Sequence, residues 1–138
     1  MILTVTLNAA LDRTLSVPNF ESGRRHRASD ALTLPGGKGV NIARALRNLG
    51  QPVIATGLAG GRTGISIIEQ LTGEGILNDF VRIADESRTS TAVVDPTSMQ
   101  QTEINEYGPS VGDAELALLM EKLAYLSKGA DIVVLAGS

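Results

Sequence analysis

The sequence has 138 residues, of which 43% are hydrophobic and 20% charged, a composition typical of a single soluble globular domain. The net charge of −3 argues against a nucleic acid as the main partner, and no apolar stretch is long enough to cross a membrane. The sequence has no cysteine, which excludes disulfides and suits a cytoplasmic protein, and its one histidine, His26, cannot form a metal site by itself.

Short apolar runs along the chain predict the strands of a sheet. The first and last of them, Ile2 to Leu7 and Asp131 to Ala136, are rich in β-branched residues. We expect both to be parallel strands that are covered on both faces. Val53 to Leu58 and Phe80 to Ile83 indicate two further strands of the same sheet.

Helical patterns lie between these runs. One apolar stripe, with a helical repeat, predicts a helix that ends at Gly50 and buries Ile42, Ala45, Leu46 and Leu49. A second helix is expected from about Thr63 to Leu71. A third, with acidic residues at its start, is expected to bury Leu116, Leu119, Met120 and Leu123. Alternating strands and helices predict a doubly wound α/β fold with a mostly parallel sheet.

Three segments do not fit this alternation. Thr14 to Val17, Arg24 to Thr33 and Thr89 to Ile104 read as short antiparallel strands, and the last is a hairpin that turns near Asp95 to Ser98. We expect these segments, at about 14–33 and 89–104, to form a separate small β-structure.

The most informative run is glycine-rich and extends from Leu34 to Leu46. Three glycines around Lys38 precede a helix, so backbone N–H groups, a cation and the amide of Asn41 can meet one polar ligand. The alternative is a plain strand-to-helix connection with a solvated lysine. The run is not a Walker A loop, because Gly39 and Val40 follow the lysine. A second glycine-rich stretch, Gly57 to Gly64, has the wrong spacing for a dinucleotide loop and predicts a turn and a helix start.

The glycine run and three further segments resemble one family of sugar kinases. These segments are Thr4 to Asp12, Thr102 to Pro109 and Ala136 to Ser138. In this order they are similar to the PfkB, or ribokinase-like, carbohydrate kinases, and most of all to the branch of 1-phosphofructokinase and tagatose-6-phosphate kinase. The resemblance covers the whole chain. Ala9 departs from it, since the branch usually has proline there, which loosens the turn before Asp12.

The resemblance implies a set of residues that bind a ketohexose phosphate. Carboxylates accept hydrogen bonds from sugar hydroxyls, glycines place backbone donors on the sugar, and cations or amides reach the phosphate. The implied residues are Asp12, Gly36, Gly37, Lys38, Asn41, Arg88, Arg27, Glu103 and Ser138. Of these, Arg27 is expected to reach into the site of a second subunit. From the residues alone, an aspartate such as Asp12 is more often a turn former, and the arginines read as surface ion-pair partners. Glu103 reads nearly as well as a charge that blocks strand pairing.

The resemblance also implies an architecture and a reaction. The three irregular segments would form a β-lid that covers the sugar and pairs with the lid of a second copy, so we expect a homodimer. Family members are longer, and their second half carries the catalytic base and nearly all of the ATP site. Residues 1–138 therefore resemble the N-terminal, substrate-binding half. A complete enzyme would transfer the ATP γ-phosphoryl group, with Mg²⁺, to the 6-hydroxyl of fructose 1-phosphate.

We expect the 138-residue chain alone to hold neither ATP nor a metal tightly and to lack kinase activity. Other functions stay open at this point. Tagatose-6-phosphate kinase shares the same motifs. A non-catalytic sugar-phosphate-binding or dimerising remnant is favoured if no partner chain completes the site. A small nucleotide-binding α/β domain is disfavoured, because the sequence has no phosphate loop.

Overall fold

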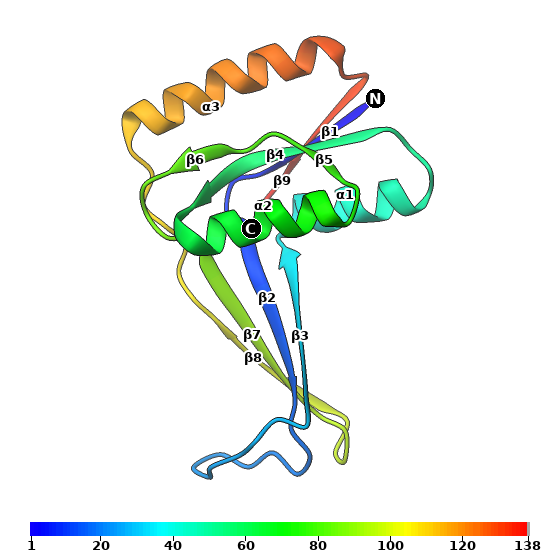
Figure 1. Ribbon diagram of the computed structural model, residues 1–138, viewed down its shortest axis with the longest axis vertical. Helices are drawn as coiled ribbons and strands as arrows, with labels where there is room; N and C mark the ends of the chain where they lie inside the picture. Colours follow the sequence, from blue (N-terminus) through cyan, green and yellow to red (C-terminus); the bar gives the residue numbers. More distant parts are fainter. Residues whose placement is uncertain (138) are drawn as a thin grey trace.

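The computed structural model describes residues 1–137, which form a layered α/β body with a long β-lid projecting from it (Figure 1). The elements follow one another in the order β1 (Ile2–Thr6), β2 (Ala10–Ser16), β3 (Asp30–Gly36), α1 (Lys38–Asn48), β4 (Val53–Gly60), α2 (Gly61–Gly73), β5 (Leu77–Asn78), β6 (Val81–Ile83), β7 (Arg88–Asp95), β8 (Gln100–Asn105), α3 (Asp113–Leu126), the 3₁₀ turn η1 (Ser127–Gly129) and β9 (Ile132–Ala136). None of the helices among these residues is long and apolar enough to cross a membrane.

The main sheet is parallel and has helices on both faces. Its strands run in the order β5, β4, β1, β9, and β6 pairs with the end of β4. Helices α1 and α2 cover one face, whereas α3 lies on the other (Figure 1). The predicted doubly wound α/β fold is therefore confirmed, with the small β-structure as a separate sheet.

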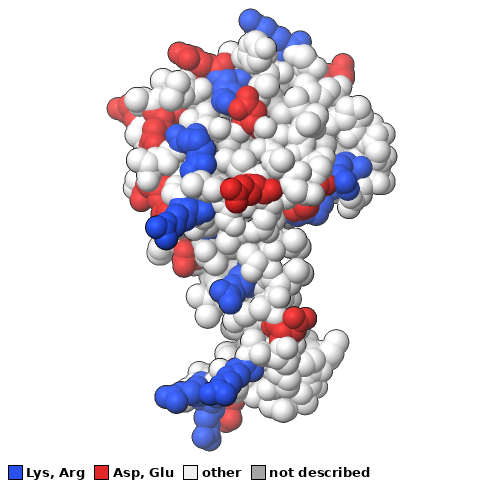
Figure 2. All heavy atoms as spheres, in the orientation of Figure 1, with Lys and Arg blue, Asp and Glu red and all other residues white. Residues whose placement is uncertain are grey.

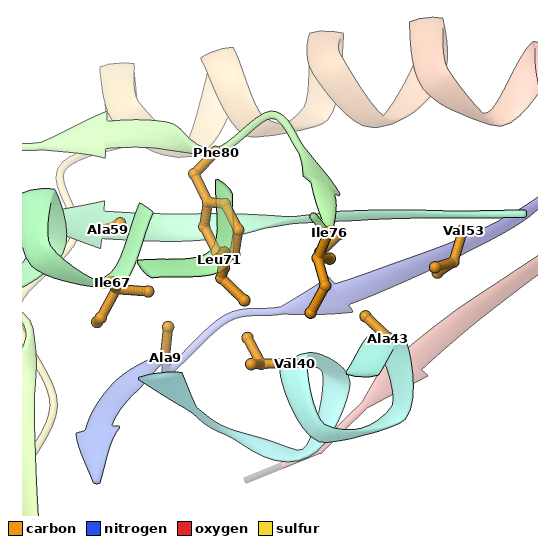
Figure 3. Close-up of a cluster of buried hydrophobic side chains, with 10 residues drawn as sticks. Ala9, Val40, Ala43, Val53, Ala59, Ile67, Leu71, Ile76 and Phe80 are labelled. Carbon is orange, nitrogen blue, oxygen red and sulfur yellow. The ribbon is translucent and has the colours of Figure 1, made fainter. Parts of the chain in front are cut away.

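The larger part of the core lies between the sheet and the two helices α1 and α2. Figure 3 shows apolar side chains from the two helices and from β4 meeting in one layer. Ile67 and Leu71 of α2 and Val40 of α1 are fully buried there. Their burial fixes both helices against the strand ends that carry the site described below.

Helix α1 buries a different face from the one predicted. Val40 and Ala43 face the sheet, Ile42 and Leu46 are half-buried, and Ala45 and Leu49 are exposed. The reason is local: Gly39 lies so close to β1 that an added Cβ would be 2.8 Å from the Val5 carbonyl oxygen. This contact turns the start of α1 toward β1 and so determines which side chains of the helix are buried in the core. The predicted helix end is confirmed, because Gly50 has a left-handed φ of 71°.

Helix α3 and strand β9 are less buried than the sequence suggests. Leu119 is fully buried and Leu123 packs beside it, but Leu116 and Met120 are exposed, because α3 rests on the short β6 and the end of β4. Strand β9 pairs only with β1 among the described residues, and its Leu135 is 73% exposed. The expectation that β9 is covered on both faces is thus wrong.

The lid is a four-stranded sheet with the order β3, β2, β7, β8. The hairpin of β7 and β8 is confirmed, but β2 and β7 pair in parallel, so the lid is not wholly antiparallel as predicted. Both strands leave the main body and run outward in the same direction (Figure 1). The predicted strand from Arg24 begins only at Asp30, since residues 17–29 form an irregular loop.

One carboxylate anchors this loop to the lid hairpin. Asp95, which is almost fully buried, accepts hydrogen bonds from the backbone N–H groups of Asn19 (2.9 Å), Phe20 (3.2 Å) and Thr97 (2.9 Å) and from the Ser98 hydroxyl (2.9 Å). These hydrogen bonds lower the pKa of Asp95 although its burial acts against them. Asp95 therefore ties the 17–29 loop to the turn between β7 and β8.

Candidate functional site

A cleft of about 710 Å³ lies where the lid leaves the main sheet. It is bounded by the carboxyl end of β1, the start of α1, the lid strands and the end of β9. In open α/β sheets, ligands bind outside the carboxyl ends of the strands. The cleft lies at this position and is lined mostly by polar side chains.

Strand pairing explains why particular side chains meet in the cleft. The register places Leu34, Asp12, Ser90 and Asn105 in one row across the lid, with Thr14, Ala92 and Glu103 in the next. Residues in one row share a face of a sheet. The rows therefore bring polar groups from β2, β7 and β8 to the same wall.

Asp12 lies on this wall within β2 and is not part of a turn. Strand β1 ends at Thr6, and residues 7–9 form the turn. Gly36 lies beside the carboxylate: a Cβ at Gly36 would be only 1.9 Å from Asp12 Oδ2. The glycine thus leaves room for the carboxylate.

The remaining glycines bring the start of α1 close to β1. Gly37 has a φ of 109°, which L side chains rarely adopt, and a Cβ there would be 2.7 Å from Thr6 Cγ2. Lys38 and Asn41, from the first turn of α1, line the cleft together with Gly37. Thr6 is buried and its Oγ1 has no hydrogen-bond partner within residues 1–137. The turn offers backbone donors at the positive end of a helix, together with a cation and an amide.

Arg88 is the first residue of β7 and lines the cleft beside Asp12. Its Nε and Nη2 both donate to the carbonyl of Asn8 at 3.4 Å, and Nη1 donates to Ser90 Oγ at 3.2 Å. These contacts fix the plane of the guanidinium, which suits it to bind an anion.

The segment before Arg88 is fastened to the start of α2. Glu86 accepts from the backbone N–H groups of Arg62 (3.2 Å) and Thr63 (2.8 Å). Hydrogen bonding with the side chain of Thr63, and then with its backbone, lowers the pKa of Glu86. Ser87 Oγ accepts from the Gly60 N–H at 2.9 Å. The predicted helix start between Gly57 and Gly64 is therefore confirmed, but residues 57–60 are the end of β4 and not a turn. The free amides at the start of α2 are already capped by a carboxylate.

Opposite charges face one another in the cleft. Burial raises the pKa of Asp12, Arg88 and Arg44 act against this rise, and Glu103 adds to it. Asp12 is therefore a carboxylate that loses hydration on folding and gains attraction from two guanidiniums. An environment of this kind is common where a side chain must bind a ligand.

Three other predicted residues, Glu103, Arg27 and Ser138, lie in different places. Glu103, from β8, lines the cleft and accepts a hydrogen bond from Gln101 at 2.8 Å. Arg27 does not line the cleft: it is exposed in the 17–29 loop, where basic side chains gather at the far end of the lid (Figure 2). Ser138 lies outside the described residues.

The sequence analysis missed several polar residues of the cleft. They include Arg13 and Thr14 of β2, Asn8 before it, Ser90 of β7, and Gln101 and Asn105 of β8. Strand periodicity could have predicted some of them, because residues two positions apart in a strand share a face of the sheet. Ser90 lies two positions after Arg88, and Gln101 and Asn105 lie two positions either side of Glu103. Arg13 carried no such signal.

Comparison with known proteins identifies the family. Residues 4–138 match the model of the pfkB family carbohydrate kinases. The chain belongs to this family. Over its whole length it is similar to a possible 1-phosphofructokinase from Thermotoga maritima, with 36% identity and a TM-score of 0.93, and it covers 45% of that chain.

Two further solved structures of this kinase family are similar. One is a putative phosphofructokinase from Staphylococcus aureus, with 31% identity and a TM-score of 0.87, in which this chain covers 44%. The other is phosphofructokinase-2 from Escherichia coli in complex with fructose-6-phosphate, with 30% identity and a TM-score of 0.92. The match includes 99% of this chain and 45% of that chain. This pfkB chain thus spans less than half the length of the relatives that it matches.

The raised pKa of Asp12 predicts that this residue costs stability at neutral pH. A carboxyl whose pKa is higher in the folded than in the unfolded chain favours folding less as the pH rises through that interval. Asp12→Asn should therefore raise the melting temperature at pH 7, and the gain should disappear below the ordinary carboxyl value of 3.8. Thermal unfolding from pH 3 to 8 tests this, with Asp30→Asn on the exposed start of β3 as the control. A lower melting temperature for Asp12→Asn at pH 7 would contradict it.

Proposed function

We propose that this chain is the sugar-phosphate-binding part of a kinase that acts on fructose 1-phosphate. The observation that carries the proposal is the meeting of Asp12 and Glu103 with Arg88 in one cleft at the strand ends. Carboxylates that accept from hydroxyls and a fixed guanidinium that binds an anion are complementary to a sugar with one phosphate. The similarity to a possible 1-phosphofructokinase supports fructose 1-phosphate in particular.

Each side of the cleft has its own part in this proposal. Asp12 and Glu103 accept hydrogen bonds from the hydroxyls, and so orient the sugar. Gly36 and Gly37 offer backbone N–H groups, while Arg88, with Lys38 and Asn41, binds phosphate or hydroxyl oxygens. Holding the sugar in one orientation is most of what a phosphoryl transfer needs from this part of the enzyme.

In the proposed reaction the 6-hydroxyl oxygen of the sugar attacks the γ-phosphorus of ATP. The bond from that phosphorus to the ADP oxygen breaks, and the hydroxyl proton passes to a base. No three His, Asp or Glu side chains gather within residues 1–137 in a way that could hold a metal ion. The part proposed for this chain is confined to the sugar phosphate.

We also propose that two copies associate through their lids. The lid exposes apolar side chains, among them Leu32 and Leu34 of β3 and Ile104 of β8, and its outer strands are open edges in the described chain. Exposed edges and apolar patches favour pairing with another chain. Arg27, in the loop at the far end of the lid, would then be free to reach the second copy.

Calorimetric titration of the 138-residue chain tests the proposed substrate. We expect fructose 1-phosphate to bind more tightly than fructose 6-phosphate or tagatose 6-phosphate, and ATP to show no saturable binding. Tightest binding of tagatose 6-phosphate would change the assigned substrate. Saturable binding of ATP with none of any sugar phosphate would overturn the proposal.

Within the cleft, Arg88→Ala should weaken binding of fructose 1-phosphate more than Lys38→Ala does. Arg88 is fixed by Asn8 and Ser90, whereas Lys38 is an exposed, flexible cation. Loss of a charge-assisted, two-point contact costs about 1.5 to 3 kcal/mol. Calorimetry at low salt measures both variants. Unchanged affinity in Arg88→Ala would remove this residue from the site.

The lid proposal predicts a dimer that one charge can dissociate. Leu32→Glu places a carboxylate on the exposed apolar part of β3 and should convert the dimer into a monomer. Leu135→Glu on β9 is the control, because Leu135 is also an exposed leucine but lies outside the lid. Light scattering measures the mass of each. Dissociation by Leu135→Glu alone would assign the contact to the sheet edge.

A further inference from the structure

Arg44 is a cation of α1 that the proposed roles leave unused. It lies one helical turn after Asn41, and its side chain is only 22% exposed. Its Nε and Nη2 donate to the two carboxylate oxygens of Glu74 at 2.5 and 2.9 Å. Glu74 follows α2 as its C-cap residue, so this two-point ion pair ties α1 to the end of α2 and fixes the plane of the guanidinium.

The same guanidinium reaches two further groups, the side chain of Asn41 and the backbone of Pro35. Nη1 donates to Asn41 Oδ1 at 3.0 Å, and Nη2 donates to the Pro35 carbonyl at 2.8 Å. Pro35 is buried and immediately precedes Gly36 and Gly37. Arg44 therefore holds both the amide of Asn41 and the backbone that enters the glycine turn.

The chemistry of arginine gives the Asn41 contact a direction. A guanidinium has donors and no acceptor, so the asparagine must turn its carbonyl oxygen toward Arg44. Its Nδ2 and both N–H bonds are then available on the other side. Since Asn41 lines the cleft, this arrangement presents the amide to a ligand as a donor.

We propose that Arg44, clamped by Glu74, is a positioning residue of the cleft that fixes Asn41 as a hydrogen-bond donor toward an oxygen of the sugar phosphate. The proposal rests on the proposed function of the cleft as a sugar-phosphate site. It assigns Arg44 no contact with the ligand. An asparagine that was free to turn would offer its acceptor to the ligand as readily as its donors, and would lose entropy on binding.

The electrostatics of the cleft agree with this role. The positive charge of Arg44 opposes the rise that burial causes in the pKa of Asp12. Asp12, in turn, favours the charged form of Arg44. The guanidinium of Arg44 thus supports the Asp12 carboxylate as an acceptor on one wall of the cleft and the Asn41 amide as a donor on the other.

A double-mutant cycle separates positioning from a general structural effect. We use Arg44→Lys, which keeps the charge but cannot reach Glu74, Asn41 and Pro35 together, and combine it with Asn41→Ala. Binding of fructose 1-phosphate is followed by NMR titration, which also measures weak binding. Arg44→Lys should raise Kd about tenfold in the wild-type background, since a hydrogen bond is lost. It should raise Kd less than about twofold in the Asn41→Ala background.

The matched control is Arg47→Lys. Arg47 lies on the same helix one turn further on, but its guanidinium hydrogen-bonds only the neighbouring Asn48, through Nη1 at 3.5 Å, and does not line the cleft. It should leave Kd unchanged. Circular dichroism of every variant checks that the helices are retained. An equal increase of Kd by Arg44→Lys in both backgrounds would show a structural role and overturn the proposal.

A second measurement needs no ligand. In the free protein, the ¹⁵N order parameter of the Asn41 side-chain amide should be high, and it should fall in Arg44→Lys and in Glu74→Gln but not in Arg47→Lys. No change in any variant would overturn the proposal. If the order parameters fall as expected but the wild type binds no fructose 1-phosphate, the positioning of Asn41 stands, and the proposed function of the cleft fails.

Discussion

The close approach of α1 to the end of β1 is the contact on which the rest of the site depends. At Gly36, Gly37 and Gly39 a Cβ would meet Asp12, Thr6 and the Val5 carbonyl within 2.8 Å or less. Only glycines allow the helix to begin so near the strand. This approach places the first turn of α1 at the cleft and turns Val40 and Ala43 into the core. The same three positions therefore set both the packing of a helix and the shape of a binding site.

The lid depends on carboxylates that bind backbone groups far away in the sequence. Glu86 caps the start of α2 just before Arg88 begins β7, and Asp95 anchors the 17–29 loop at the other end of that strand. Strand β7 is thus fixed at both ends. Because β7 pairs with β2, the same anchors hold Asp12 and Arg88 in neighbouring rows.

The helices contribute to the cleft in unequal ways. Helices α1 and α2 are packed into the larger core and are linked by the ion pair of Arg44 and Glu74, which reaches the cleft through Asn41 and Pro35. Helix α3 buries mainly Leu119 and leaves much of its apolar surface exposed, as does β9. Helices α1 and α2 are therefore better packed than α3 and β9.

The sequence by itself determined the alternation of strands and helices, the hairpin of β7 and β8, and the glycine run with its family, because periodicity, turn residues and motif spacing are local properties. It also named Asp12, Lys38, Asn41, Arg88 and Glu103, which do line the cleft. The tertiary structure alone decided the parallel pairing of β2 with β7, the buried face of α1 and the exposure of β9. It also placed Arg13 and Asn105 in the cleft and brought Glu74 to Arg44. These depend on which elements become neighbours, and contacts between residues 30 or more positions apart leave no periodic trace in one sequence.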